Sequence, residues 1–169
     1  MVALSAAAAT ATAPSIRRLG RGDMPEVERH LLALGPADRR KRFLSPAGDG
    51  AIARYVSALG PGHAVLVGAA GPDGRSVGAA EAHPVVDAPR TVEAAVSAHP
   101  YHRREGLGRR LAAQAVALAF AKGAEAALFL FAPDNRGVAR LAGSLGARVA
   151  ATGRALLLAE APGALKQAA

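Results

Sequence analysis

The chain has 169 residues and a net charge of +8, and 51% of its residues are hydrophobic. This content is sufficient for the core of one compact domain and excludes a disordered chain. Cysteine is absent, which excludes a disulfide framework, a zinc finger and a thiol nucleophile. The five histidines lack the spacing of a metal site, so we expect no bound metal. Tryptophan is absent and tyrosine occurs twice, which argues against a surface that stacks nucleic-acid bases.

The excess of positive charge is compatible with nucleic acid, anionic lipid or a polyanionic cofactor as a partner. No uninterrupted run of about 18 apolar residues occurs, so we expect no membrane-spanning helix. Residues 1–14 are rich in alanine and threonine, and they lack the basic residues of a secretory signal. We therefore expect a disordered tail over 1–14, a single domain over 15–160, a C-terminal tail over 161–169 and residence in the cytoplasm.

The first part of the chain predicts a short strand followed by three helices. Residues 15–19 form the strand, and a helix with apolar residues at helical spacing begins after Gly22-Asp23. Gly35-Pro36 ends this helix and opens a second, short helix that carries the basic run Arg39–Arg42. A third helix begins at Asp49. We expect the basic run to be an exposed helix face, with docking of an acidic substrate as the alternative.

The rest of the chain alternates strands and helices. Strands are predicted over 63–69, 76–85, 91–98 and 126–132, and helices over 106–122 and 135–145. Gly-Pro-Asp-Gly at 71–74 is typical of a hairpin turn, and 148–159 forms either one strand or a hairpin. This order of elements predicts a mixed α/β fold in which helices cover a central sheet.

The segment most informative about function joins the strand predicted over 91–98 to the helix that follows it. Arg103, Gly106 and Gly108 form the pattern R-x-x-G-x-G directly before this helix. The glycines allow a ligand to approach the backbone, and the amides and dipole of a helix start attract negative charge. Four arginines surround the turn: Arg103, Arg104, Arg109 and Arg110. The pattern therefore predicts a binding site for a diphosphate.

This pattern resembles the signature of the GNAT superfamily of N-acetyltransferases, which is [Q/R]-x-x-G-x-[G/A] after a strand. Val96-Ser97-Ala98 is similar to the end of the family's fourth strand, where backbone groups meet the pantetheine arm of acetyl-CoA. Asn135 matches an asparagine that opens the next helix and touches the cofactor. The segment 33–59 is similar to the front helices of bacterial protein lysine acetyltransferases. The resemblance covers about 15–159 and implies a GNAT-like sheet of six or seven mostly antiparallel strands with helices on both faces.

The resemblance implies transfer of an acetyl group from acetyl-CoA to a primary amine by direct attack in a ternary complex. Glu93 stands where many relatives carry the glutamate that accepts the amine proton, and it is our candidate catalytic base. A solvated or arginine-paired strand carboxylate is the alternative for Glu93. The residues implied to bind the cofactor are Val96, Ser97, Ala98, Arg103, Arg104, Glu105, Gly106, Leu107, Gly108, Arg109 and Asn135.

One position departs from the family's pattern. Ala142 stands seven residues after Asn135, where many relatives carry a tyrosine that protonates the leaving thiolate. Ser144 or water is left to supply this proton. On the strand predicted over 76–85, we expect Glu81 and His83 at the surface, with a place in the acceptor site as the alternative.

Two other classes of function stay open on the sequence. A non-catalytic acyl-CoA-binding or regulatory domain would keep the diphosphate site without the chemistry, and the missing tyrosine points in that direction. A nucleic-acid-binding module would account for the charge, but the few aromatic residues and the clustering of arginines at one helix start argue against it. The amine acceptor, the acyl-chain preference and the oligomeric state stay open, and a homodimer is possible.

Overall fold

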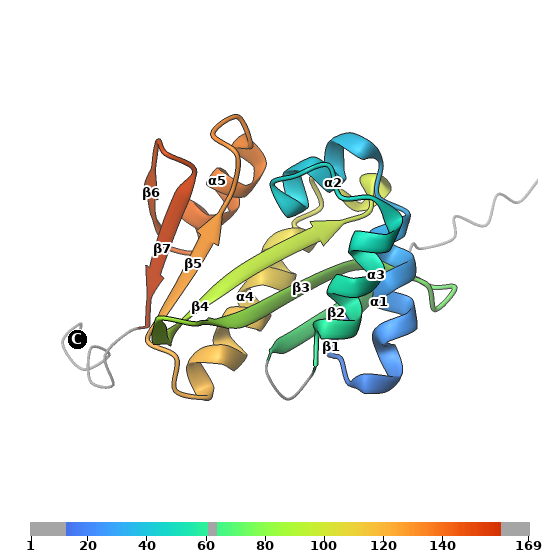
Figure 1. The fold of residues 1–169 in the computed structure, drawn as a ribbon, viewed down its shortest axis with the longest axis horizontal. Helices are drawn as coiled ribbons and strands as arrows, with labels where there is room; N and C mark the ends of the chain where they lie inside the picture. The colour runs from blue at the N-terminus through green and yellow to red at the C-terminus, as the bar shows by residue number, and fades with distance from the viewer. Residues whose placement is uncertain (1–12, 61–63, 160–169) are drawn as a thin grey trace, which may run out of the picture.

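The computed structural model describes residues 13–60 and 64–159 (Figure 1). The tails predicted over 1–14 and 161–169 lie outside these ranges, except for residues 13 and 14. His63, the first residue of the strand predicted over 63–69, also lies outside the described residues. Within the described residues, no helix is long and apolar enough to cross a membrane.

Seven strands form one sheet in the described part of the chain. They are β1 (Ser15–Arg18), β2 (Val65–Ala70), β3 (Ser76–Val85), β4 (Ala88–Ala98), β5 (Ala126–Leu130), β6 (Arg148–Ala150) and β7 (Arg154–Leu158). Their order across the sheet is β1-β2-β3-β4-β5-β7-β6. Of the pairs described, β4 with β5 is parallel and the others are antiparallel. The mixed α/β fold with six or seven mostly antiparallel strands is therefore confirmed.

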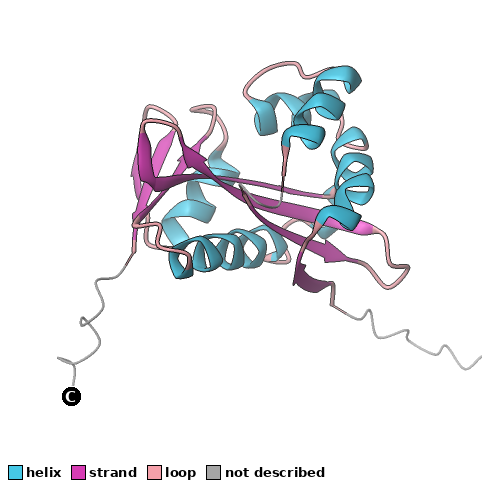
Figure 2. Cartoon of the chain, turned by 60° about the horizontal axis from the view of Figure 1, so that its bottom comes forward, coloured by secondary structure: helices cyan, strands magenta, loops and turns pink. Residues whose placement is uncertain are grey.

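Helices cover both faces of this sheet, as the GNAT resemblance implied (Figure 2). The α-helices of the described residues are α1 (Met24–Leu32), α2 (Pro36–Phe43), α3 (Asp49–Ala58), α4 (Leu107–Ala121) and α5 (Arg136–Ser144). Two short 3-10 helices span Arg21–Asp23 and Pro100–His102. The three N-terminal helices lie over one face, and α4 and α5 lie over the other (Figures 1 and 2).

The apolar run of β2 shows why both faces are covered. Successive side chains of a strand point to opposite faces. Val67 packs into the core beneath α4, whereas Leu66 packs with Leu31 of α1 and Ile52 of α3. All four side chains are at most 2% exposed. A strand that is apolar at consecutive positions is therefore buried on both sides.

Residues 148–159 form a hairpin rather than a single strand, because Gly153 makes the turn between β6 and β7. Its φ of +81° favours glycine, and a Cβ atom there would lie 2.1 Å from the carbonyl oxygen of Phe131. The amide of Phe131 in turn donates to the carbonyl of Gly153 at 2.9 Å. The hairpin turn predicted at 71–74 is also present, with the amide of Gly74 bonded to the carbonyl of Gly71 at 3.0 Å.

The two central strands β4 and β5 pair only near their starts. The pairing joins Thr91–Glu93 to Ala126–Leu128, after which β4 runs on to Ala98 and the strands separate (Figure 1). Over 94–98, β4 still pairs with β3 on its other side. Over 94–98 the edge of β4 that faces β5 is thus not paired with a neighbouring strand in the described structure.

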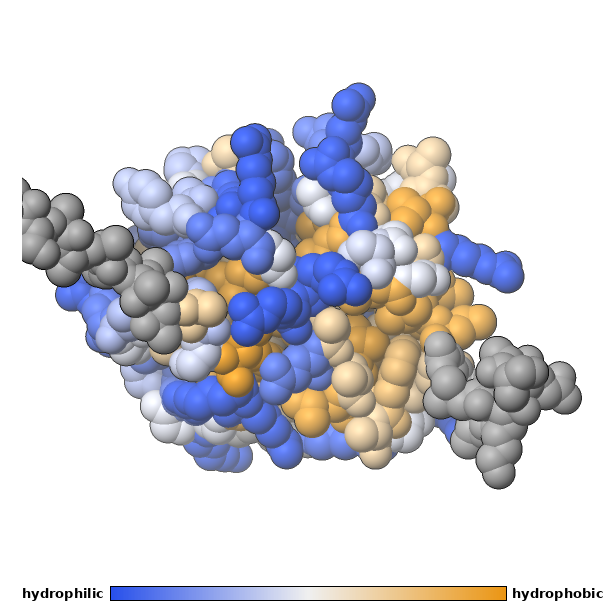
Figure 3. Space-filling model, turned by 180° about the vertical axis from the view of Figure 1, so that it is seen from behind, coloured by the Kyte–Doolittle hydropathy of each residue, from blue (hydrophilic) through white to orange (hydrophobic). Residues whose placement is uncertain are grey.

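The rear of the molecule, which is the side that carries α4 and α5, is drawn in Figure 3. Hydrophilic side chains project around much of its margin, and apolar surface is more continuous toward the end of the sheet that holds β5–β7. The large apolar residues exposed on the hairpin at that end are Val149, Leu156 and Leu158.

Candidate functional site

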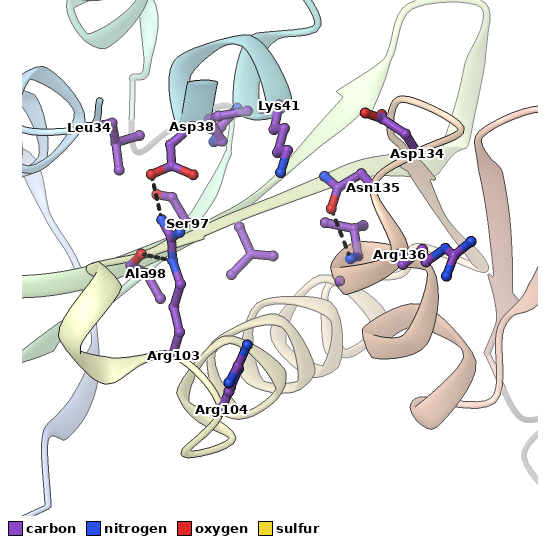
Figure 4. Close-up of a pocket in the computed structure, with 14 residues that line it drawn as sticks. Leu34, Asp38, Lys41, Ser97, Ala98, Arg103, Arg104, Asp134, Asn135 and Arg136 are labelled. Atoms are coloured by element: carbon purple, nitrogen blue, oxygen red, sulfur yellow. Dashed lines mark hydrogen bonds and ion pairs between the residues drawn. The ribbon is translucent and has the colours of Figure 1, made fainter. Parts of the chain in front are cut away.

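A cavity of about 470 Å³ lies where β4 and β5 separate. Figure 4 shows it between α2, the end of β4 with the loop before α4, and the segment around Asn135. Among the residues that line it, five are basic and two are acidic, so this first cavity is positively charged. They are Lys41, Arg42, Arg103, Arg104 and Arg136, against Asp38 and Asp134. A cavity of this charge suits a polyanionic ligand.

The R-x-x-G-x-G turn leads into the start of α4, and two of the arginines that line the first cavity, Arg103 and Arg104, belong to this turn. Gly106 precedes the helix with φ +75°, and a Cβ atom on it would meet nothing within 4 Å. No side chain caps this helix in the described structure, and its first bond runs from the amide of Arg110 to the carbonyl of Gly106 at 3.0 Å. The amides of Leu107, Gly108 and Arg109 lack an intrahelical acceptor and are available to an anion.

Arg103 is held by an acidic residue from the other side of the cavity. Its Nη2 lies 2.7 Å from Oδ2 of Asp38 in α2, and its Nε donates to the carbonyl of Ala98 at 3.3 Å (Figure 4). Both members of the ion pair line the cavity. An anion that binds Arg103 therefore competes with Asp38.

Six of the predicted cofactor-binding residues line the first cavity together. They are Val96, Ser97, Ala98, Arg103, Arg104 and Asn135. Asn135 also caps α5, because its Oδ1 accepts a hydrogen bond from the amide of Val138 at 3.3 Å.

The other five predicted cofactor-binding residues do not line this cavity. Leu107 is a core residue that is 2% exposed, and Gly108 comes within 3.4 Å of the Leu141 side chain when a Cβ atom is placed on it. Arg109 donates through Nε to the hydroxyl of Ser144 at 3.2 Å. Glu105 lies beside His102. Gly106 shapes the turn before α4. For all five residues, contact with the cofactor stays a prediction, which depends on how far a ligand extends along α4.

Ser97 is oriented by a buried histidine. Its Oγ lies 2.9 Å from Nε2 of His30 in α1, and the two residues are 9% and 4% exposed. Burial, followed by the proximity of His99 and Arg42, lowers the pKa of His30 to about 4. The imidazole is therefore uncharged at neutral pH and links α1 to the part of β4 that lines the cavity.

This shift predicts an acid-sensitive contribution of His30 to stability. Below pH 6.5 the unfolded chain binds a proton at His30 that the folded chain does not bind until about pH 4. The free energy of unfolding therefore falls across this range, by about 3 kcal/mol in all for a shift of this size. In urea unfolding followed by circular dichroism, His30→Gln should lose less stability than the native chain between pH 7 and pH 4. Parallel losses in the two proteins would contradict the prediction.

A second cavity of about 690 Å³ lies among α2, α3, β3 and β4. Glu93, the candidate base, lines this cavity and not the first. Its other acidic lining residues are Glu81 and Asp87, and its one basic lining residue among those described is Arg42, so the cavity is negatively charged. Arg42 lines both cavities and marks where they meet.

Arg42 belongs to a buried polar cluster in the second cavity. Its Nη2 donates to Oε1 of Glu81 and lies 3.0 Å from the hydroxyl of Tyr55, which also donates to Oε1 of Glu81. Nε2 of His83 lies 3.5 Å from both of these oxygens. The side chains of Arg42 and Glu81 are 9% and 5% exposed. Burial raises the pKa of the Tyr55 hydroxyl. Burial lowers the pKa of His83, and the nearby charge of Arg42 lowers the pKa of His83 further. The phenol is thus a donor at neutral pH, and the imidazole is uncharged.

Two predictions from the sequence are wrong here. The basic run is not uniformly exposed, because Arg42 points into the protein, and Arg39 donates to the carbonyls of Leu32 and Leu34. Glu81 is not a surface residue but a buried one, since α2 and α3 cover this part of β3. Sequence reasoning missed Arg42 and Tyr55 as site residues, because the packing of α2 and α3 selects which polar side chains of an amphipathic helix turn inward.

Comparison with known proteins identifies the family of this chain. The sequence profile of the Acetyltransferase (GNAT) family matches residues 36–147, which is more than half of the chain. The chain belongs to this family of acetyltransferases. No curated protein matches it.

Solved GNAT structures share the fold at low sequence identity. The GNAT domain of S. lividans PAT is 15% identical to this chain with a TM-score of 0.73, and the match covers 86% of this chain and 90% of that domain. A Sinorhizobium meliloti phosphinothricin acetyltransferase in complex with AcCoA is 21% identical (TM-score 0.64, 85% of each chain). Vibrio cholerae spermidine N-acetyltransferase in complex with CoA and spermine is 15% identical (TM-score 0.64, 86% and 95%).

Ala142 stands where the GNAT resemblance led us to expect a tyrosine. It is fully buried, and its methyl group offers no proton. The hydroxyl of Ser144, the substitute considered from the sequence, donates to the carbonyl of Leu141 at 2.7 Å and lines neither cavity.

Proposed function

We propose that the protein is an acetyl-CoA-dependent N-acetyltransferase that binds acetyl-CoA in the first cavity and a primary amine in the second. The observation that carries this proposal is the opposite charge of two cavities that meet at Arg42. A positive cavity suits the phosphates of CoA, and a negative one suits a protonated amine. The acetyl-CoA- and CoA-bound GNAT structures named above support the choice of co-substrate.

The proposed cofactor contacts follow the chemistry of the first cavity. Arg103, Arg104 and the amides at the start of α4 would hold the diphosphate. The unpaired edge of β4 over 96–98 would bind the pantetheine arm through its peptide groups. Asn135 would contact the cofactor from the segment before α5. The free helix start and the open space at Gly106 support this fit.

The proposed reaction uses Glu93 as the base. The carboxylate takes a proton from the ammonium group, directly or through water, and the amine nitrogen then attacks the thioester carbonyl carbon. As the carbon–sulfur bond breaks and CoA leaves as the thiolate, the nitrogen gives its second proton to water and the neutral amide forms. We propose that water then protonates this thiolate, since neither Ala142 nor Ser144 supplies a proton.

Calorimetric titration of CoA and acetyl-CoA tests the first cavity. We expect micromolar binding to the native chain and its loss in Arg103→Ala/Gly108→Glu, because the added side chain enters the helix start beside Leu141. Arg110→Ala is the matched control, since Arg110 lies on the same helix but does not line the cavity. Failure of the native chain to bind either ligand would contradict the proposal. Release of CoA thiol in the presence of amines then tests the transfer.

Asp38→Asn should strengthen CoA binding. The substitution removes an anion that occupies Arg103 and reduces the negative charge of the cavity. Because a partly exposed ion pair contributes about 0.2–1 kcal/mol, we expect the dissociation constant to fall by a factor of about 1.4 to 5. Asp134→Asn is the control, because that residue lines the cavity without pairing with Arg103. Weaker binding in Asp38→Asn would show that Asp38 orients Arg103 rather than competing for it.

A non-catalytic acyl-CoA-binding domain is the second candidate, and Ala142 is the observation that favours it. This alternative predicts that CoA and acetyl-CoA bind in the titration, while no amine releases CoA thiol. The two candidates therefore share the first experiment and differ in the second.

A further inference from the structure

We propose that the second cavity selects primary amines that carry no carboxylate, and that Glu81 is the residue that sets this selectivity. The proposal rests on the proposed function, since it takes the second cavity as the acceptor site. It goes further because it names the chemistry of the acceptor and the residue that excludes amines carrying a carboxylate.

The first step concerns the cation that a carboxylate would need. Arg42 is the one basic residue among the described residues that line the second cavity. Its Nη2 is bound to Glu81, and its guanidinium carbon lies 4.9 Å from the ring centre of Phe43 and 5.5 Å from that of Tyr55. Nε of Arg42 has no hydrogen-bond partner among the described residues, but Glu81 already neutralises the charge of the guanidinium. A carboxylate on the acceptor would therefore gain little net attraction from Arg42.

The second step concerns the charge that remains. With Arg42 and Glu81 paired, the other charged lining residues are Glu93 on β4 and Asp87 in the β3–β4 turn, and both are acidic. His83 adds no positive charge at neutral pH, because burial and the nearby Arg42 lower its pKa. The cavity therefore attracts a cation and repels an anion.

The third step concerns the walls. Leu44 and Val86 line the cavity and are 49% and 93% exposed, so apolar surface surrounds the acidic groups. Such walls favour an amine with an alkyl or aromatic body. Glu81 thus acts by neutralising Arg42, the one cation in the lining that would attract a carboxylate, so that the charge of Glu93 and Asp87 is left to repel it.

Three acceptors of equal chain length test the proposal: pentylamine, pentane-1,5-diamine and 5-aminopentanoate. They share the primary amine and differ at the far end, which is neutral, cationic or anionic. For the native chain we expect kcat/KM for 5-aminopentanoate to lie at least about tenfold below that for pentylamine, with the diamine at or above pentylamine. Equal use of 5-aminopentanoate and pentylamine would overturn the proposal.

Two variants test the residues. Glu81→Gln frees Arg42 while its amide oxygen still accepts hydrogen bonds, so the preference for pentylamine over 5-aminopentanoate should shrink or reverse. An unchanged ratio in a variant that melts like the native chain would overturn the role of Glu81. If Glu81→Gln does not fold, Asp87→Asn on the exposed turn tests the electrostatic argument instead. Removing one repelling charge should reduce the ratio of kcat/KM for pentylamine to kcat/KM for 5-aminopentanoate. An unchanged ratio in Asp87→Asn overturns the electrostatic argument. Glu125→Gln, outside the lining of both cavities, should leave all ratios unchanged.

A binding measurement separates this proposal from the proposed function. If no amine is acetylated, ligand-observed NMR with the full chain measures how strongly each of the same three compounds binds. Weaker binding of 5-aminopentanoate than of the other two would support the selectivity although the transfer had failed. Equal binding of all three, or binding of none, would overturn the selectivity whatever the CoA titration shows.

Discussion

Glu93→Gln should lower kcat for amine acetylation by about 10²–10⁴-fold, because the amide cannot accept the proton of the attacking ammonium group. Glu93 lines the second cavity, where the amine is proposed to bind, and not the first. The KM for acetyl-CoA should therefore change by no more than about twofold. Steady-state release of CoA thiol at saturating acetyl-CoA measures both quantities.

The control for this experiment is Glu125→Gln, which removes a carboxylate of the loop before β5 that pairs with Arg90 at the surface. It should keep native turnover. Native turnover in Glu93→Gln as well would remove Glu93 as the base, and His83, which lines the same cavity and is uncharged at neutral pH, would be the next candidate.

Arg42→Met should destabilise the fold by about 3–5 kcal/mol, because it leaves Glu81 charged, buried and without its cation. For a chain of this size the melting temperature should fall by roughly 10 °C. Urea unfolding and thermal melting by circular dichroism measure the loss, and the absence of tryptophan makes this probe preferable to fluorescence.

Arg40→Met provides the matched control, since Arg40 is an exposed arginine on the same helix. It should change the free energy of unfolding by no more than about 0.5 kcal/mol. The double variant Arg42→Met/Glu81→Met should recover most of the lost stability, because neither buried charge remains. Equal losses in Arg42→Met and Arg40→Met would contradict the buried ion pair.

Local signals in the sequence were sufficient to predict most of the elements. The period of apolar residues placed each helix and strand close to its observed bounds, and glycine and proline marked where they end. The choice between one strand and a hairpin over 148–159 stayed open, because it depends on the contact of Gly153 with Phe131, 22 residues earlier. A contact of that kind leaves no periodic pattern in either segment.

The first cavity was largely predictable and the second was not. The R-x-x-G-x-G pattern lies in one short segment, so its arginines, glycines and helix start are adjacent in the sequence as well as in space. The buried cluster draws Arg42 from α2, Tyr55 from α3, and Glu81 and His83 from β3, up to 41 positions apart. Periodicity assigns a side chain to a face of its own element, but it does not identify the partner across the interface.

The sequence by itself determined the mixed α/β fold, the glycine turn that leads into the uncapped start of α4 and the membership of the GNAT family, because each follows from a local pattern of residues. Only the tertiary structure decided that Asp38 occupies Arg103, that His30 orients Ser97, and that Arg42 is buried between two cavities of opposite charge. These contacts depend on how α1 and α2 pack against β3, β4 and the loop after β4. Long-range packing of this kind arises from the whole core, and no short segment of the chain encodes it.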